Sequence, residues 1–467
     1  MAQATLLLFL TGCSSSADIR RRAVGREAVA PAVDDLQRRT FQWFWDTTNP
    51  KNGLVPDRWP SKSFSSVAAV GFGLTAYPIG VERGWVTREA ARDRVLTTLR
   101  FFWNAPQGDA ATGMTGHRGF FYHFLDMETG HRFERVELST IDTALFMAGA
   151  LFCQSYFDRD DPGEREIRDL AEKLYRRVEW NWFQVHSPLI TMAWTPEGGF
   201  GQAEYHGYNE AHFLYILALG SPTHPVTEAA WPAWTNRIRW GSFYGYEHGN
   251  FAPLFGHQYS HVWFDFRGIF DDYMRAKGID YFENSRRATL AQRAYAIDNP
   301  NNFEGYGENV WGLTACDGPI DARIEVDGRP IQFWTYRARG AALGEITDDG
   351  TIAPTAAASS IAFTPQESTA AIVEMIRRYG DHLYQQYGFL DAFNDTLDLT
   401  GLQLQHGRVV PGAGWFDSDY LGIDQGPIVA MIENHRSGLV WEVMKKNEHV
   451  VRGLKRAGFT GGWLEQR

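Results

Sequence analysis

Three acidic residues stand where the sequence predicts that unusually apolar helices begin. Asp142, Glu210 and Asp424 each come just before, or within the first turn of, a long apolar run. Glycoside hydrolysis needs one carboxyl group that stays protonated and donates to the leaving oxygen. It also needs one ionised carboxylate that activates water or attacks the sugar. These acids are therefore candidates for the catalytic groups of a carbohydrate-active cleft.

Each acid also has a purely structural explanation. Ser139 and Asp142 have the spacing of a capping box, Asp424 fits an N-cap, and Glu210 in a first turn is stabilised by the helix dipole. For any one acid alone, capping explains the residue as well as catalysis does. The aromatic, small and amide neighbours that all three share favour a sugar site when the acids are taken together.

Helical periodicity dominates the chain and indicates how these acids could meet. Strand-like alternation is confined to residues 323–326 and 331–334, which predict a small hairpin. We predict an all-α fold, an (α/α)6 toroid with long aromatic-rich loops, in which parallel inner helices bring their N-termini to one rim. The lack of strand–helix alternation argues against a doubly wound sheet or a β/α barrel. Apolar residues recur at helical spacing near 34–46, 66–83, 87–103, 139–156, 164–182, 209–219, 226–240, 266–277, 284–297, 367–387, 424–434 and 438–457.

Two other motifs resemble cofactor- or metal-binding sites, but their contexts favour structural roles. Residues 71–76, Gly-Phe-Gly-Leu-Thr-Ala, fit a dinucleotide fingerprint, but they lie in a helical pattern without a βαβ unit. Close helix packing is the better interpretation. His257 and His261 are four residues apart, yet no glutamate completes a zinc motif, so we expect core or hydrogen-bonding roles and neither a metal nor a cofactor.

The composition of the chain indicates which kinds of molecule it could bind. The chain has 467 residues, with 45 basic and 56 acidic side chains and a net charge of −11, which argues against a nucleic-acid or anionic-membrane surface. Hydrophobic residues make up 44% and charged residues 22%, as in a folded protein. Aromatic residues reach 14%, and their flat apolar faces suit stacking on sugar rings.

The first residues resemble a bacterial lipoprotein signal. An apolar run over residues 4–10, too short to span a bilayer, leads into Leu-Thr-Gly-Cys ending at Cys13, although no basic residue precedes it. We expect a signal peptide over 1–13, a lipid anchor on Cys13, a tether over 14–33 and a single domain over 34–462. The protein would then be periplasmic or anchored to the outer membrane, whereas the alternative is a poorly ordered N-terminus. Cys153 and Cys316 are expected to be buried free thiols.

A series of distinctive blocks runs along most of the chain: Phe41–Asp46, Val70–Leu74, Gly80–Trp85, Phe120–Asp126, Glu137–Ala150, Gly207–Ala211, Leu217–Pro225, Glu308–Ala315 and Gly422–Pro427. These blocks resemble the glucoamylase-like domain of bacterial lipoproteins, and within it glycoside hydrolase family 144, the bacterial β-1,2-glucanases. The resemblance runs from about Leu36 to Arg456 with the blocks in order. It implies a single (α/α)6 toroid that hydrolyses β-1,2-glucan with inversion and without a metal.

The resemblance also implies roles for the acids. Glu210 matches the essential glutamate and is expected to be the general acid, while Asp142 and Glu137 match a required acidic segment that orients water or substrate. Asp424 and Asp391 are the candidates for the general base, and Asp424 is preferred for its place at a helix start. Two features depart from the pattern. Cys316 replaces a small polar residue, and residues 321–358 form a variable segment that we expect to decide substrate length or tolerance of cyclic glucans.

Aromatic and polar side chains in loops and at helix ends are expected to form the sugar subsites. Any single one of them more often packs in the core or at the rim, so the prediction concerns the set. The stacking candidates are Trp45, Trp59, Tyr122, Tyr205, Tyr208, Trp311, Trp334 and Trp415, and the hydrogen-bonding candidates are Arg58, Arg118, His123 and Gln202.

Three functions remain open from the sequence. The leading one is an exported, monomeric endo-β-1,2-glucanase that acts on linear or cyclic glucan, or an exo-acting relative that releases sophorose. The second is a glucoamylase-like hydrolase of another glucan, since fold does not determine substrate. The third is a lipid-anchored glycan-binding protein without catalysis, which would depend on its tryptophans and survive the loss of Glu210.

Overall fold

The computed structural model describes residues 30–186 and 188–466. The predicted signal peptide over 1–13 and residues 14–29 of the predicted tether over 14–33 lie outside these residues. Among the described residues, no helix combines the length and apolar character that crossing a membrane requires.

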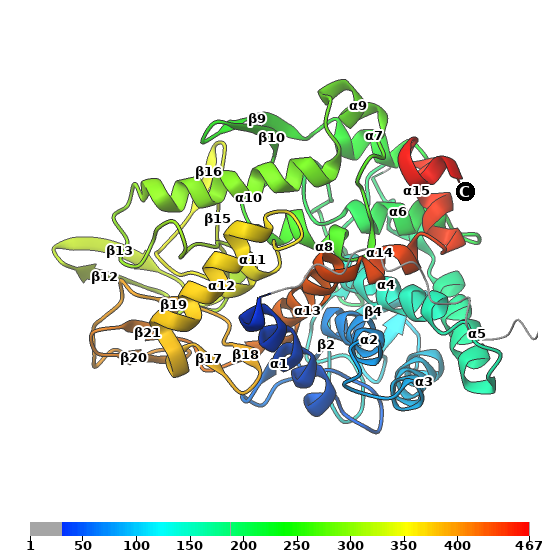
Figure 1. The fold of residues 1–467 in the computed structure, drawn as a ribbon. Coiled ribbons are helices and arrows are strands. Elements are labelled where there is room, and N and C mark those ends of the chain that lie inside the picture. The colour runs from blue at the N-terminus through cyan, green and yellow to red at the C-terminus, as the bar shows by residue number, and fades with distance from the viewer. Residues whose placement is uncertain (1–29, 187, 467) are drawn as a thin grey trace, which may run out of the picture.

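Helices dominate the described part of the chain (Figure 1). The α-helices are α1 (Pro31–Thr47), α2 (Val67–Glu82), α3 (Arg88–Asn104), α4 (Thr140–Tyr156), α5 (Pro162–Arg177), α6 (His212–Gly220), α7 (Ala230–Thr235), α8 (Phe255–Trp263), α9 (Asp272–Lys277), α10 (Tyr281–Asp298), α11 (Pro354–Ala358), α12 (Pro365–Tyr379), α13 (Gly422–Ser437), α14 (Leu439–Met444) and α15 (Glu448–Arg456). Short 3₁₀ turns cover Trp180–Phe183, Gly380–His382 and Gly462–Gln466.

Most predicted helices are present, and the exceptions have physical reasons. The segment predicted over 226–240 forms only α7 before the chain enters a strand. The segment predicted over 438–457 is two helices, because the Asn447 side chain accepts from the amides of His449 and Val450 and starts α15. Helix α8 was not predicted, since its buried face includes polar residues such as Gln258 and Ser260, which hide the apolar period.

Small antiparallel sheets accompany the helices, more of them than the all-α prediction allowed. The predicted hairpin is confirmed as β12 (Ala322–Val326) with β13 (Arg329–Phe333). Most other strands have two or three residues, too short to show an alternating pattern. The pairs are β1 (Arg58–Trp59) with β22 (Tyr420–Leu421), β2 (Ser65–Ser66) with β5 (Phe124–Leu125), β9 (Arg239–Phe243) with β10 (Tyr246–Asn250), β11 (Ala315–Cys316) with β14 (Arg337–Ala338), β15 (Gly340–Ala342) with β16 (Glu345–Thr347) and β17 (Tyr384–Gln385) with β18 (Gly388–Phe389). Larger sheets have the orders β3 (Gly116–His117), β4 (Phe120–Tyr122), β6 (Leu138–Ser139), β7 (Ala193–Thr195), β8 (Gly199–Phe200), and β19 (Phe393–Asn394), β21 (Gly414–Phe416), β20 (Arg408–Val410).

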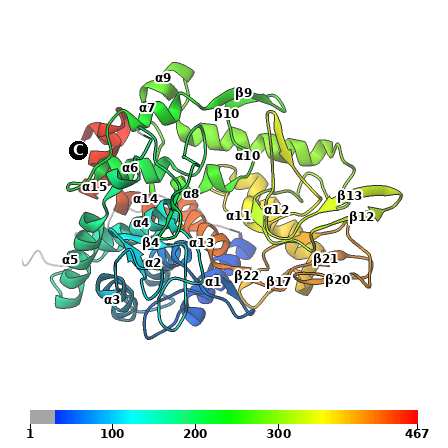
Figure 2. The same ribbon diagram turned by 180° about the vertical axis from the view of Figure 1, so that it is seen from behind.

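One set of helices is buried over nearly its whole surface, and another has one apolar face. Every residue of α6 and α11 is buried, as are most residues of α2, α4, α8 and α13. These helices contact one another in the series α11, α13, α2, α4, α6, α8, and α8 also contacts α13. Helices α1, α3, α5 and α12 bury one face only, and Figures 1 and 2 show α3 and α5 at the periphery. Helices that are apolar all round belong in a core, so the first set forms the centre of the molecule.

The glycines of the apparent dinucleotide motif serve helix packing, as interpreted from the sequence. Helices α2 and α4 approach so closely that a Cβ on Gly149 would lie 2.2 Å from the carbonyl oxygen of Gly71. A Cβ on Gly71 would in turn lie 2.3 Å from the carbonyl oxygen of Leu145. Cys153 and Cys316 are buried free thiols, as predicted.

We predict that Gly149→Ala destabilises the protein by about 2 kcal/mol or more, because the methyl group would overlap the α2 backbone. The intrinsic helix preference for alanine, about 1 kcal/mol, acts in the opposite direction. Gly307→Ala is the control, since no atom lies within 4 Å of a Cβ there. Equal urea-unfolding midpoints for the two variants would contradict the packing interpretation.

Candidate active site

Glu210 lies at the start of α6, a helix of the buried set. The N-terminus of α6 is held by Asn209, whose Oδ1 accepts from the Ala211 amide at 3.0 Å, and by Ser260 of α8, whose hydroxyl donates to the Glu210 carbonyl at 2.9 Å. The Glu210 side chain is partly exposed. Burial raises the pKa of its carboxyl to about 7, and the charge of Asp142 adds to that increase. Glu210 can therefore hold a proton near neutral pH and remain accessible.

His123 joins the two other acids of the predicted acidic segment. Its Nδ1 lies 2.8 Å from Oε1 of Glu137, and its Nε2 lies 3.7 Å from Oδ1 of Asp142. Burial lowers the pKa of His123, but the charge of Asp142 and the hydrogen bond to Glu137 outweigh that effect and raise it to about 9. The hydrogen bond to His123 lowers the pKa of Glu137, whereas burial raises that of Asp142. The result is an imidazolium held between two carboxyl groups.

The capping role expected for Asp142 is also present. Ser139 is the N-cap of α4, its Oγ accepts from the Asp142 amide at 3.2 Å, and its hydroxyl donates to the Asp142 carboxylate. Capping and participation in the site are thus compatible for this residue, because one carboxylate oxygen faces Ser139 and the other faces His123.

A second group of buried carboxyl groups surrounds the start of α13. The amide of Asp317 donates to Oδ2 of Asp391 at 2.8 Å. Burial and the charge of Asp317 raise the pKa of Asp391 to about 7. Burial and the charge of Asp391 raise the pKa of Asp424 well above its usual range. The N-cap expected at Asp424 is wrong, since Leu421 occupies that position and Oδ2 of Asp424 has no hydrogen-bond partner among the described residues.

Arg58 supplies the positive charge for this second group. Its Nη1 donates to Oδ2 of Asp317 at 2.6 Å, and its Nε lies 3.4 Å from Oδ2 of Asp57. Strand β1 pairs with β22 in the register Arg58↔Leu421, which places the guanidinium beside the first turn of α13. Burial disfavours the charged guanidinium, but the charges of Asp317 and Asp57 raise its pKa.

Two side chains lie near both groups. The pKa of Tyr259, on α8, is raised mainly by burial. The charges of Asp424 and Glu210 both add to this increase. Asp57 similarly lies near both Asp317 and His123, and burial raises its pKa to about 6 against the charge of Arg58. Tyr259 and Asp57 therefore connect the Glu210 side to the Asp424 side.

Several predicted subsite residues are in the core and cannot stack on a sugar. The ring of Tyr208 stacks on His257, with centroids 4.4 Å apart, and Trp45 packs with Phe41 and Arg94 on the outer helices. Arg118 pairs with Glu179. Trp45 is partly buried against the core, and the rings that are fully or almost fully buried, contrary to the subsite prediction, are Tyr122, Tyr208, Trp311 and Trp415.

Some of the other predicted residues lie at the site, and the rest are open to solvent. His123 and Arg58 contact carboxylates of the site directly. Burial raises the pKa of Tyr205, and the charges of Glu210, Asp142 and Glu137 raise it further. Trp59 is exposed beside Arg58, Trp334 is partly exposed and Gln202 is exposed. Sequence reasoning missed Asp57, Asp317, Asp417, Tyr259 and Tyr336. The Asp-Ser-Asp run at 417–419, directly before the block at 422–427, was the available signal for part of this group.

Among the described residues, those of the second group have carboxylate oxygens close enough together to bind a cation. Single carboxylate oxygens of Asp317, Asp391 and Asp417 lie within 4.8 Å of one another, and those of Asp317 and Asp419 lie equally close to a nitrogen of His406. Arg58 already supplies a positive charge to Asp317. His257 and His261 have core roles, with His261 Nε2 3.0 Å from the Ser285 hydroxyl and His257 Nε2 3.2 Å from the Phe251 carbonyl.

Comparison with known proteins places this constellation in a family. Residues 202–448 match the family model described as "Putative glucoamylase". The chain belongs to this glucoamylase-like family. A crystal structure of a glucoamylase family member from Bacteroides uniformis is 33% identical, covers 92% of this chain and 98% of its own, and superposes with a TM-score of 0.78.

Relatives with an assigned activity act on β-1,2-linked glucans, as the resemblance to family 144 implied. An endo-β-1,2-glucanase from Chitinophaga pinensis, solved with sophorotriose and glucose, is 28% identical over 93% of this chain and all 100% of its own, with a TM-score of 0.78. An exo β-1,2-glucooligosaccharide sophorohydrolase from Parabacteroides distasonis is 28% identical over 91% of this chain. The glucoamylase-like chain spans 57% of that relative's length.

We predict that Arg58→Met destabilises the protein more at about pH 8 than at about pH 5.5. Without the guanidinium, the raised pKa values of Asp57 and Asp391 rise further, so the folded state binds protons that the unfolded state has lost. Stability then falls as pH increases through those values, and the loss at high pH should be about 2 kcal/mol or more. Arg100→Met, which removes an exposed ion pair with Glu166, is the control. Urea unfolding at both pH values measures the difference, and a pH-independent loss would contradict the assignment.

Proposed function

We propose that this glucoamylase-like protein is a glycoside hydrolase that cleaves β-1,2-glucan with Glu210 as the general acid. The observation that carries the proposal is a partly exposed carboxyl group with a pKa of about 7, near Tyr259, which also lies near a second group of carboxyl groups. One group that is protonated and one that can be ionised are the minimum for acid–base hydrolysis. The activities of the relatives support the choice of glucan.

In this mechanism Glu210 donates its proton to the glycosidic oxygen as the bond to the sugar breaks. Asp424 and Asp391 are the candidates for the base. Burial raises the pKa of both, and the charge of Asp391 raises that of Asp424 further, whereas a hydrogen bond with Asp424 lowers that of Asp391. The one that is ionised accepts a proton from water, directly or through a substrate hydroxyl, and water attacks from the opposite face with inversion. Asp142, Glu137 and His123 position substrate, and the charge of Asp142 favours the protonated form of Glu210.

The helix arrangement supports an (α/α)6 toroid with the site at one rim. In this proposal α2, α4, α6, α8, α11 and α13 are the inner helices, and their contacts follow a closed series. Asp142 and Asp424 lie in the first turns of α4 and α13, and Glu210 lies just before α6. Parallel inner helices would bring these N-termini together, where the helix dipoles favour carboxylates.

The proposed setting is a monomer outside the cytoplasm, held to a membrane by lipid on Cys13. Its support is the Leu-Thr-Gly-Cys sequence and the tether-like composition that follows it. Globomycin-sensitive processing of the full chain and labelling with a palmitate analogue would test the anchor, and Cys13→Ala is the control.

We predict that the purified protein degrades linear β-1,2-glucan and that Glu210→Gln lowers kcat by about 10²- to 10⁴-fold, the contribution typical of a general acid. Glu166→Gln, at an exposed ion pair, should retain full activity. Product chromatography distinguishes a ladder of oligosaccharides, expected for endo action, from sophorose alone, expected for exo action. Binding without cleavage would favour the glycan-binding alternative, and cleavage of an α-glucan instead would favour the second hydrolase alternative.

We predict that kcat/KM falls as pH rises through about 7, because Glu210 must be protonated to donate. The charge of Asp142 raises the pKa of Glu210, so Asp142→Asn should move this alkaline limb to lower pH. A pH–rate profile of both proteins on the same glucan measures the shift. An unmoved limb would show that another group controls it.

A further inference from the structure

The variable segment over 321–358 brings Tyr336 to the edge of the second group of carboxyl groups, the one around the start of α13. Its strand β14 pairs with β11 in the register Cys316↔Arg337. The paired strands end at this register, and Tyr336 and Asp317 are the residues that directly flank it. Asp317 in turn holds Asp391 through its amide and Arg58 through its carboxylate. The segment is thus attached to the residues that carry the site's charges, while its β12–β13 hairpin projects from the molecule (Figures 1 and 2).

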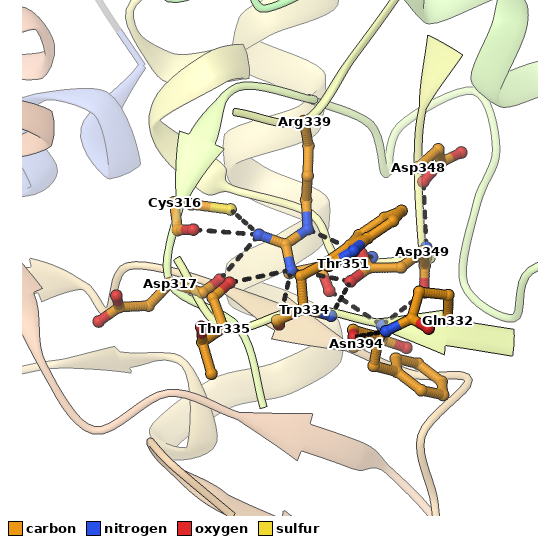
Figure 3. Close-up of polar contacts among 12 residues, drawn as sticks. Cys316, Asp317, Gln332, Trp334, Thr335, Arg339, Asp348, Asp349, Thr351 and Asn394 are labelled. Atoms are coloured by element: carbon orange, nitrogen blue, oxygen red, sulfur yellow. Dashed lines mark hydrogen bonds and ion pairs between the residues drawn. The ribbon is translucent and has the colours of Figure 1, made fainter. Parts of the chain in front are cut away.

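A buried guanidinium fixes this attachment (Figure 3). Arg339 Nε and Nη2 donate to the two carboxylate oxygens of Asp349 at 2.7 and 2.8 Å, and both side chains are fully buried. Its Nη1 donates to the Cys316 carbonyl at 3.0 Å, and its Nη2 donates to the Trp334 carbonyl at 3.0 Å. One side chain therefore joins the end of β11, the loop before β14 and the Asp349 turn.

The loop that carries Tyr336 has further anchors. The amide of Thr335 donates to Oδ1 of Asp321 at 3.0 Å, and its hydroxyl donates to Oδ2 of Asp321 at 2.8 Å. The amide of Trp334 donates to Oδ2 of Asp349 at 3.1 Å. The backbone before Tyr336 is held on both sides, so this loop presents the side chain in a defined direction.

Tyr336 itself has no comparable anchor. Its side chain is 50% exposed, and its hydroxyl has no hydrogen-bond partner among the described residues. Burial is nevertheless the largest cause of its raised pKa, followed by the charges of Asp424 and Asp391. The ring is therefore half-exposed and lies near enough to Asp424 and Asp391 for their charges to affect its hydroxyl. The phenol stays protonated there and can donate a hydrogen bond.

We propose that Tyr336 binds the glucan beside Asp424 and Asp391, with its ring against a sugar face and its hydroxyl donating to a sugar oxygen. Arg339 is the positioning residue that holds the Tyr336 loop against β11. This inference rests on the proposed function, and it names a residue of the variable segment through which substrate selection would act. A rigid aromatic residue with a free polar edge suits this role, because little conformational entropy is lost on binding.

The test compares Tyr336→Phe and Tyr336→Ala with Ile346→Ala, an exposed apolar residue of the same segment. On linear β-1,2-glucan and on short sophorooligosaccharides, Tyr336→Ala should raise KM by about tenfold or more, with kcat changed by less than about threefold. Tyr336→Phe should raise KM by about threefold, since it loses only the hydrogen bond. Ile346→Ala should match the wild type.

Binding measurements separate the failure of this inference from failure of the proposed function. Titration of Glu210→Gln with sophorooligosaccharides, with and without Tyr336→Ala, should show weaker binding when the ring is absent. If the wild type cleaves the glucan and Tyr336→Ala keeps its KM, binding and product pattern, the Tyr336 assignment is wrong and the hydrolase proposal stands. If the wild type neither cleaves nor binds β-1,2-glucan, both are wrong.

A double-mutant comparison tests the positioning role of Arg339. Arg339→Lys keeps the charge beside Asp349 but loses the planar fork that reaches the carbonyl groups. It should raise KM, and it should add little in a Tyr336→Ala background, because both changes act through the same ring. Lower thermal stability with an unchanged KM would show that Arg339 is only structural. Full additivity of the KM effects would also overturn the role.

Discussion

Many carboxyl groups share a small, poorly solvated volume in this protein, and their mutual repulsion is the constraint that the surrounding structure must satisfy. Ionised carboxylates are costly to bury unless they are paired or protonated. Arg58 pairs with Asp317 and Asp57, and His123 is charged between Glu137 and Asp142. The remaining groups respond by holding protons, and the pKa of Glu210 and of Asp391 reaches about 7.

That response is also what makes the site chemically useful. A carboxyl group that is protonated at neutral pH can act as an acid, and a neighbour of similar pKa can be ionised in the same molecule. Tyr259 and Asp57 each lie near carboxyl groups of both sets, and the charges of both sets affect their pKa values. The buried pair Arg339–Asp349 extends this frame to the variable segment.

The sequence indicated the elements of the fold better than their lengths. Long apolar segments such as 66–83 and 139–156 became α2 and α4 nearly as predicted, because burial on all sides leaves a continuous apolar run. Helix α8 escaped prediction because its buried polar residues bond to distant partners, as Gln258 does to Ala356 and Ser360. The short strands escaped for a related reason, since their partners lie far along the chain and leave no local period.

The chain by itself determined which residue types could do acid–base chemistry and which helices they precede, because capping and apolar periodicity are local in sequence. It pointed to Glu210, Asp142, His123 and Arg58, which the structure brings to one site. Only the tertiary structure decided that Trp45, Trp311 and Trp415 are packing residues, and that Asp317 and Tyr336 stand at the site. Whether an aromatic face is free, and how far a carboxyl group is desolvated, depends on atoms brought from remote parts of the chain.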